Sequence, residues 1–371
     1  MKVMVVMGTR PEVIKLAPVV GALRSVAETV VCSSGQHREM LEQALSVFCI
    51  EPDIRLDVMV PGQSLNALAA TLLSALDRAI EQARPDWVLV QGDTTTAFCA
   101  GMAAFHRGVP VGHVEAGLRT GNLASPFPEE ANRSLLARLT TRHFAPTRRA
   151  RANLLGEGIA ESTVVVTGNT VVDAIGMVRQ SWSSTPPALP AEVHSSEGHV
   201  LVTCHRRENF GDVMHGICRA LRRLCARYPH RRWLFPVHPN PAVREPVRRE
   251  LHGIENLVLM DPVDYAGSLY LISRSALVVS DSGGIQEEAP TFGVPVVVMR
   301  HHTERREGLD AGFATLAGQS PDKIEAVVAG WLDDPDRCGA LRNRDNPYGD
   351  GRAAARIVAS LQGQPIGDFG G

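Results

Sequence analysis

The chain has little cysteine, no surplus of either charge and no apolar run long enough to cross a membrane. Its seven cysteines are scattered without a CxxC pair, so we expect reduced thiols rather than a disulfide framework or a zinc site. A formal net charge of −2 provides no basic field for nucleic acid. The HExxH and GxxxxGK motifs are missing too. What remains is an ordinary globular composition, with 44% hydrophobic and 21% charged residues.

The first residues lack the pattern of a secretory signal, because an apolar strand pattern begins at residue 2. Together with the dispersed cysteines, this start predicts a cytoplasmic protein without a membrane segment. The length of 371 residues favours two domains.

Short apolar, β-branched runs alternate with longer helical patterns along the chain. This alternation predicts an α/β fold, in which parallel sheets are covered by helices. Strands are expected at residues 3–7, 87–90, 109–113, 164–167, 200–203, 233–237, 257–260, 277–280 and 296–299, and helices include 65–84 and 214–228.

The alternation restarts after a Ser/Pro-rich stretch at residues 181–190, which is typical of a surface connection. We therefore predict two Rossmann-like domains of similar size, residues 1–169 and 170–351. Ligands of such sheets bind at the carboxyl ends of the strands, so the predicted site is the cleft between the two domains.

The segment DSGGIQEE at residues 281–288 follows an apolar run and contains a glycine turn. Strand, glycine turn and helix start together point backbone N–H groups at an anion. Ser282 can cap this helix and donate to the same anion. Glu288, about two turns further on, can accept hydrogen bonds from a vicinal diol. Phosphate and diol indicate a nucleotide, although an ordinary capped βα turn is the alternative.

Polar clusters also follow the strands of the first half. Arg10, in GTRPE, is a potential bidentate phosphate donor, and Lys15 lies one turn further on. Asp93, in GDTTT, is either a carboxylate facing the cleft or a plain helix N-cap. Glu115, in HVEAG, has no evident structural role at a strand end. Glu129, in SPFPEEANR, either faces the site or forms a surface i,i+4 ion pair with Arg133.

In the second half, the alternating charges of TCHRREN at residues 203–209, which include His205, indicate an anion site, with a solvated loop as the alternative. His238, in PVHPNP, is interpreted as a structural residue rather than a catalytic one. Polar, phosphate-compatible groups thus follow nearly every predicted strand, and this joint pattern indicates function more strongly than any single motif.

These motifs resemble those of the non-hydrolysing UDP-N-acetylglucosamine 2-epimerases. The matching segments are GTRPEVIKLAP, GQHREML, GDTTTA, GHVEAGLRTGN, SPFPEEANR, TGNTVVDA, HRREN, PVHPNPAVREPV, DSGGIQEEAP and NPYGDG, in this order between residues 8 and 351. The resemblance implies a GT-B architecture of two Rossmann-like domains, with a C-terminal helix at about 352–371 packing back on the first. It also implies a cytoplasmic homodimer that needs neither metal nor nicotinamide cofactor.

The implied reaction inverts C2 of UDP-GlcNAc to give UDP-ManNAc, a precursor for surface polysaccharides. It runs by anti elimination of UDP to 2-acetamidoglucal, followed by re-addition. By resemblance, the catalytic residues are Asp93, Glu115, Glu129 and His205. We expect crowding of the carboxylates to raise at least one pKa, which allows one acid and one base in the same pocket.

The resemblance also assigns residues to substrate binding and regulation. Pro262 and Tyr265 would frame the uracil and Glu288 would hold the ribose. The remaining substrate-binding residues are Arg10, Lys15, Arg133, Ser282, Gly283, Gly284 and Arg305. A possible second UDP-GlcNAc site that promotes closure would involve Gln36, Gln63 and His238.

The chain departs from the family pattern at Arg306, at Phe313 and at the pair His301 and His302. These departures bear on sugar specificity, loop rigidity and regulation more than on the reaction class. Three other functions stay open at this point: a hydrolysing 2-epimerase, a GT-B glycosyltransferase and a catalytically silent UDP-sugar sensor.

Overall fold

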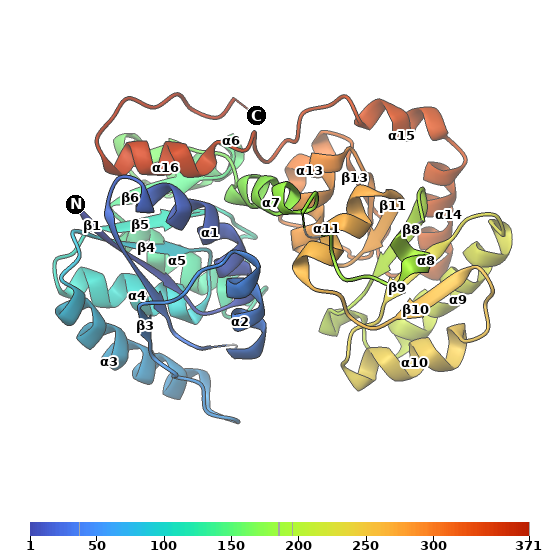
Figure 1. The fold of residues 1–371 in the computed structure, drawn as a ribbon, viewed down its shortest axis with the longest axis horizontal. Helices are drawn as coiled ribbons and strands as arrows, with labels where there is room; N and C mark the ends of the chain where they lie inside the picture. The colour runs from blue at the N-terminus through green and yellow to red at the C-terminus, as the bar shows by residue number, and fades with distance from the viewer. Residues whose placement is uncertain (37, 185, 195, 371) are drawn as a thin grey trace. The chain divides into compact units, whose positions relative to one another are not determined.

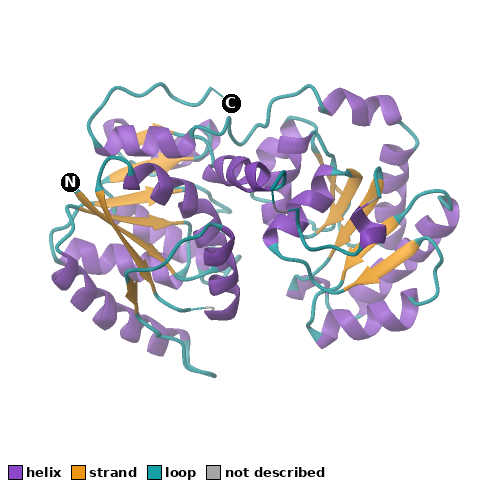
Figure 2. Cartoon of the chain, in the orientation of Figure 1, coloured by secondary structure: helices purple, strands orange, loops and turns teal. Residues whose placement is uncertain are grey.

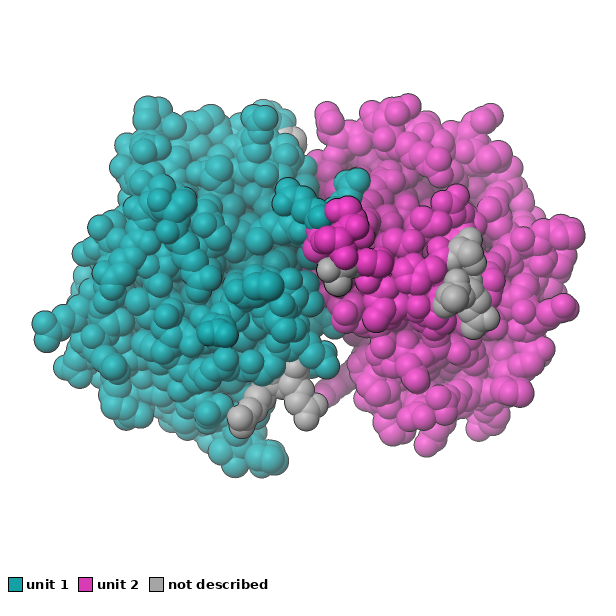
Figure 3. Space-filling model, viewed as in Figure 1, with its two compact units in different colours: residues 1–180, 348–371 teal, residues 181–347 magenta. Residues whose placement is uncertain are grey.

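The computed structural model describes residues 1–36, 38–184, 186–194 and 196–370. The chain forms two compact units (Figures 1 and 3). Unit 1 comprises Met1–Gln180 and Tyr348–Gly371, and unit 2 comprises Ser181–Pro347. Within the described ranges, none of the helices is both long and apolar enough to cross a membrane.

Unit 1 contains a seven-stranded parallel sheet in the order β3-β2-β1-β4-β5-β6-β7 (Figure 2). Crossovers from β1 to both sides of the sheet give the Rossmann-type order, with a switch point between β1 and β4. The strands are β1 (Lys2–Met7), β2 (Glu28–Ser33), β3 (Ile54–Arg55), β4 (Trp87–Gln91), β5 (Val111–Val114), β6 (Arg142–Ala145) and β7 (Val164–Val166).

The helices of unit 1 cover this sheet. They are α1 (Arg10–Arg24), α2 (Arg38–Val47), α3 (Leu65–Ala83), α4 (Thr95–His106), α5 (Glu129–Leu139), α6 (Arg148–Gly156), the 3-10 turn η1 (Glu161–Thr163), α7 (Thr170–Ser181) and α16 (Ala353–Leu361). In α3, the Ser64 hydroxyl accepts a hydrogen bond from Ala67 N at 3.2 Å and so caps the helix. Leu68, Leu72 and Leu76, at helical spacing, are buried in the core.

Unit 2 contains a six-stranded parallel sheet in the order β10-β9-β8-β11-β12-β13. The strands are β8 (His199–Thr203), β9 (Trp233–Pro236), β10 (Leu257–Met260), β11 (Ser275–Ser280), β12 (Val296–Val298) and β13 (Ala314–Leu316). The helical elements are α8 (Ala191–His194), η2 (Arg207–Asn209), α9 (Asp212–Arg227), α10 (Pro241–Leu251), α11 (Tyr265–Ser273), α12 (Gly283–Glu288), η3 (Ala289–Phe292), α13 (Arg306–Asp310), α14 (Pro321–Leu332) and α15 (Pro335–Leu341).

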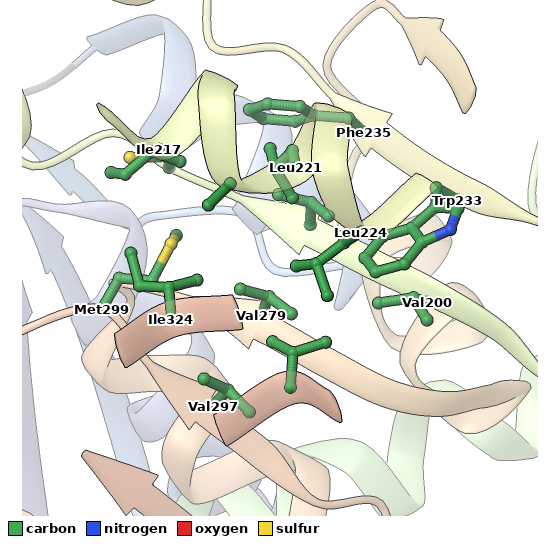
Figure 4. Packing of buried hydrophobic residues seen from close by; sticks show 14 of the residues in the cluster. Val200, Ile217, Leu221, Leu224, Trp233, Phe235, Val279, Val297, Met299 and Ile324 are labelled. Atoms are coloured by element: carbon green, nitrogen blue, oxygen red, sulfur yellow. The ribbon is translucent and has the colours of Figure 1, made fainter. Parts of the chain in front are cut away.

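The core of unit 2 lies between its sheet and helices α9 and α14 (Figure 4). Val279 and Val297 on the sheet pack with Leu221 and Leu224 on α9 and with Ile324 on α14, and all five are fully buried. This packing holds the strands rigid, so that the loops after their carboxyl ends have a fixed base. Two parallel-sheet α/β units confirm the predicted GT-B fold class.

Residues 170–180, predicted to open the second domain, belong to unit 1. The reason is that α7 is bonded to the returning C-terminal segment. Asn169 N donates to Tyr348 O at 2.7 Å, and the Asp173 carboxylate accepts from the N–H groups of Ala353 and Ala354 at 3.2 and 2.9 Å. These two amides open α16, which packs against α1. Thr185, in the predicted connection, lies outside the described residues.

Candidate active site

Glu115 directly follows β5, at the carboxyl end of the unit 1 sheet, and only 7% of its side chain is exposed. Its backbone adopts φ +64°, a strained value for a residue with a side chain. The carboxylate accepts hydrogen bonds from Lys15 Nζ on α1, from Gln91 Nε2 on β4 and from Asn169 Nδ2 at 3.3 Å. Donors from α1, from β4 and from the loop between β7 and α7 therefore compensate the buried charge and fix its position.

Asp93 lies in the turn after β4, directly after Gly92, which adopts a positive φ of 70°. The buried His113 stabilises this turn through its Nε2, 2.7 Å from Gly92 O. Thr94 caps α4, since its hydroxyl accepts from Ala97 N at 3.0 Å. Asp93 is therefore not the N-cap of α4, and the alternative interpretation of Asp93 as a plain cap was wrong.

Arg133 on α5 is the charged partner of Asp93. Its Nη1 lies 3.3 Å from Asp93 Oδ2, and its Nε donates to Glu130 Oε2 at 2.7 Å. Glu130 also accepts from Thr120 N and Gly121 N, so it joins the loop after β5 to α5. Arg133 therefore pairs with Asp93 and Glu130, and not with Glu129 as in the predicted alternative of an i,i+4 surface ion pair. Glu129, the first residue of α5, remains partly exposed.

The buried carboxylate of Glu12 links the loops after β1 and β4. It accepts from Gly8 N at 3.1 Å, from Thr9 Oγ1 at 2.7 Å and from Thr94 Oγ1 at 2.8 Å. These loops carry Arg10, which begins α1, and Asp93. This role of Glu12 was not predicted from the sequence, although Thr9 and Glu12 have the spacing of a helix-capping box.

Burial raises the pKa of Glu12 from 4.5 to about 7, although hydrogen bonds from Thr9, Thr94 and Gly8 lower it part of the way. In unfolded chains this carboxyl ionises above 4.5, whereas in the folded unit it ionises only near 7. Stability is therefore lost as the pH rises from about 4.5 to about 7.

We expect Glu12→Gln to remove this loss, so that the variant gains roughly 2–3 kcal/mol relative to the wild type between pH 5 and pH 8. Hydrogen exchange of unit 1 amides at several pH values measures it. The exposed Glu161→Gln should follow the wild type, and parallel pH profiles for Glu12→Gln and wild type would contradict the expectation.

His113 has the opposite dependence on pH. Burial lowers its pKa from 6.5 to about 3, and the hydrogen bond to Gly92 O offsets this only in part. The folded state therefore holds His113 neutral, and unit 1 loses stability as the pH falls below 6.5. This contribution is common to Glu12→Gln and to the wild type, so it cancels in their comparison.

In unit 2, His205 and Asp281 form a pair at the adjacent ends of β8 and β11. Asp281 is fully buried, and its Oδ1 lies 3.2 Å from Nδ1 of His205, whose side chain is 41% exposed. The ring of His238 stacks beside that of His205, with 6.0 Å between centroids. The structure thus brings His205 and His238 together, after the carboxyl ends of the neighbouring strands β8 and β9.

The turn at residues 281–284, predicted to bind phosphate, has the helix cap that its sequence predicts. Ser282 caps α12 by accepting from Ile285 N at 3.5 Å. A Cβ placed on Gly284 would lie 3.5 Å from Oε1 of Glu288, so this carboxylate turns back along the helix. A Cβ on Gly283 would lie 2.7 Å from the guanidinium carbon of Arg305, so a larger residue there would have to displace that side chain.

Arg305 itself is anchored within unit 2. Its Nε donates to Glu287 Oε1 at 2.8 Å and its Nη1 to Glu304. Burial acts to raise the pKa of Glu304, but Arg305, Arg300 and Arg206 together lower it to about 2. The loop after β12 is thus a network of guanidinium and carboxylate groups beside the α12 turn.

The residues predicted around uracil differ in exposure. Pro262 is exposed, whereas the side chain of Tyr265 is only 4% exposed at the start of α11. Asp264 caps that helix by accepting from Gly267 N at 2.7 Å. The ring of Tyr265 is therefore too buried to stack on a base. A base bound here would meet the start of α11 instead.

Of the predicted regulatory residues, Gln36 and Gln63 belong to unit 1 and His238 belongs to unit 2. Gln36 accepts from Thr96 Oγ1 at 2.8 Å, and Gln63 Nε2 donates to Val58 O at 3.3 Å. His238 stands beside His205. His37, in the same matching segment as Gln36, lies outside the described residues.

Two of the departing residues have clear structural positions. Phe313 is 1% exposed and belongs to the hydrophobic core of unit 2. Arg306 begins α13. Over the part of the chain that the structure describes, no three His, Cys, Asp or Glu side chains cluster so as to hold a metal ion.

Two Rossmann-like units with charged side chains gathered at the carboxyl ends of parallel strands define a protein of the GT-B class. Comparison with known proteins then gives the family. The family model described as UDP-N-acetylglucosamine 2-epimerase matches residues 22–362. The chain belongs to this epimerase family of enzymes.

Individual relatives agree over the whole length. The UDP-N-acetylglucosamine 2-epimerase of Yersinia pestis is 47% identical, over 99% of this chain and 100% of that protein. The Escherichia coli K12 enzyme of the same name is 45% identical, with the same coverage. A crystal structure of the Neisseria meningitidis UDP-GlcNAc 2-epimerase bound to UDP-GlcNAc has 43% identity and a TM-score of 0.91, covering 98% of this chain and 100% of that one.

Proposed function

We propose that the protein interconverts UDP-GlcNAc and UDP-ManNAc without releasing the free sugar. The observation that carries this proposal is the division of groups between the units. Unit 1 carries Asp93 and Glu115 after the ends of β4 and β5 and Glu129 at the start of α5, while unit 2 holds His205 and the capped α12 turn. The names of the relatives support the same substrate.

The chemistry needs both sets of groups. The C2 proton of the sugar has no adjacent carbonyl, so it leaves only as the C1–O bond to UDP breaks and positive charge develops on the ring. A carboxylate takes this proton, a C1=C2 double bond forms and the bonding electrons of C1–O depart with UDP. Re-addition of UDP and protonation of C2 from the other face complete the inversion.

In this proposal, unit 1 acts on the sugar. Asp93, Glu115 and Glu129 stabilise the cationic ring and exchange the C2 proton, and Lys15 and Arg133 hold the carboxylates in place. Arg10, at the start of α1, supports the diphosphate as a bidentate donor.

Unit 2 retains the leaving group in the same proposal. His205, Ser282, Gly283 and Gly284 bind the diphosphate, and Glu288 binds the ribose hydroxyls. Pro262 and the helix start at Tyr265 bind uracil, and Arg305 braces the α12 turn. From the family resemblance we also propose a homodimer that needs no metal or nicotinamide cofactor, regulated by a second nucleotide sugar near Gln36, Gln63 and His238.

The test is NMR of purified protein with UDP-GlcNAc in D₂O. We expect deuterium to enter C2 and UDP-ManNAc to accumulate with its UDP attached. No C2 exchange under any condition would sink the proposal. Free ManNAc with UDP would identify a hydrolysing enzyme, and turnover only with an added acceptor a glycosyltransferase. A sensor would bind UDP-GlcNAc without any turnover.

A further inference from the structure

The buried carboxylate of Asp281 accepts hydrogen bonds from several donors in the segment that follows β8. They come from His205 N at 3.0 Å, Arg206 N at 2.9 Å, Asn209 Nδ2 at 2.9 Å and Cys204 Sγ at 3.2 Å. These donors fix the whole segment after β8 onto the end of β11. The same carboxylate also faces Nδ1 of His205 at 3.2 Å.

The contact with Nδ1 determines which nitrogen of His205 remains for a ligand. A carboxylate accepts a hydrogen bond from Nδ1–H, so the neutral ring carries its proton on Nδ1 and leaves Nε2 unprotonated. The carboxylate of Asp281 is also close enough to interact with positive charge on the ring. The ring is 41% exposed, so Nε2 is accessible while Nδ1 is held.

Asp281 keeps its charge despite its burial. Burial acts to raise its pKa, but hydrogen bonds and charge from His205 and the amides of His205 and Arg206 hold the pKa well below its usual range. Other charged groups also adjoin the pair. Arg206 donates through Nε to Asp281 O at 3.1 Å. Beyond Arg206 lie Arg300, Glu304 and Arg305 from the loop after β12.

His238, on the loop after β9, is the other titratable ring beside the pair. Burial lowers its pKa, and the charge of His205 lowers it further. Of these two rings, His205 is the one whose Nδ1 lies 3.2 Å from the Asp281 carboxylate.

We propose that Asp281 is a positioning residue that holds His205 with Nδ1 protonated and Nε2 directed to the diphosphate of UDP. This inference rests on the proposed function for its ligand. As the C1–O bond breaks, negative charge grows on the diphosphate oxygen, and the Nε2–H of the charged ring donates a hydrogen bond to it. Asp281 exerts its effect through the ring and touches no reacting atom.

The first test is ¹⁵N NMR of the histidine side chains in the ligand-free wild type, with His205→Gln used to assign the signal. The neutral His205 ring should show the Nδ1–H form, and an Nε2–H form would overturn the proposal without any change to Asp281. Asp281→Asn should shift the ring toward the Nε2–H form, which is the commoner tautomer of an unheld imidazole.

The second test is calorimetric binding of UDP at neutral pH. Loss of a charge-assisted hydrogen bond predicts about tenfold weaker binding for Asp281→Asn and for His205→Gln. The double variant should bind like His205→Gln, because Asp281 acts through His205. A further loss in the double variant, or unchanged affinity in Asp281→Asn, would overturn the proposal. Asp322→Asn, which removes an exposed carboxylate paired with Arg223, is the matched control.

These readouts separate the two proposals. If the wild type shows the Nδ1–H form and UDP binding depends on Asp281 through His205, the positioning role holds even where no C2 exchange is found in D₂O. If C2 exchange is found but Asp281→Asn changes neither the tautomer of His205 nor the affinity for UDP, the proposed function holds and the positioning role fails.

Discussion

Replacing Glu115 by glutamine is expected to lower kcat for epimerisation by about 10²–10⁴-fold while UDP affinity stays within about threefold of wild type. Glutamine preserves the shape and can still accept the bond from Lys15. It supplies neither a negative charge for the electron-poor ring nor a base for C2. UDP affinity should be conserved because the groups proposed to hold UDP belong mainly to unit 2, whereas β5 belongs to unit 1.

Steady-state rates from NMR and UDP calorimetry measure this split. The exposed Glu28→Gln, whose carboxylate pairs with Lys2 at 2.9 Å, is the control and should match the wild type in both. A Glu115→Gln variant that keeps a third or more of the wild-type kcat would contradict a catalytic role. Equal losses of kcat and UDP affinity would instead indicate disruption of the fold.

The same experiment in D₂O separates the two faces of C2. A variant that loses exchange from one epimer but keeps it from the other has lost the group serving that face. Comparing Glu115→Gln with Asp93→Asn and Glu129→Gln therefore assigns each carboxylate, which the sequence pattern left open.

The fold was predictable where strands are buried from end to end. Strand β12 and most of β1 are apolar and buried, and their runs stand out from the polar loops around them. The strands that were missed carry a different signal. β2 begins with the exposed Glu28, β6 begins with Arg142, and β3 and β13 have only two and three residues. Tertiary pairing, more than local composition, makes these segments strands.

The placement of Glu115 and Asp93 after neighbouring strands was predictable, but the hydrogen bonds that hold them were not. Carboxyl ends of parallel strands share one edge, so Glu115 and Asp93 could be grouped from the chain alone. Lys15 and Glu115 are 100 positions apart, and Asn169 and Glu115 are 54 apart. Such pairs, like the hydrogen bond from Thr94 to Glu12, can be recognised only when the strand order is known.

Lys15→Met is expected to lower the free energy of unfolding of unit 1 by about 3 kcal/mol at pH 8, because it leaves the buried Glu115 carboxylate without its cationic partner. Both side chains are at most 9% exposed, so water does little to replace the lost partner. Hydrogen exchange of the β1, β4 and β5 amides measures the effect in unit 1. Tryptophan fluorescence would mix the two units, since Trp87 lies in unit 1 whereas Trp182, Trp233 and Trp331 lie in unit 2.

The double variant Lys15→Met with Glu115→Gln distinguishes a buried charge from lost packing. Without either charge, most of the loss should be recovered, because the penalty belongs to the unpaired carboxylate and not to the methionine. Lys2→Met, which removes a largely exposed ion pair with Glu28, should change stability little. If the double variant is as unstable as Lys15→Met, the cost lies in packing around α1, and Glu115 tolerates burial through its amide donors Gln91 and Asn169.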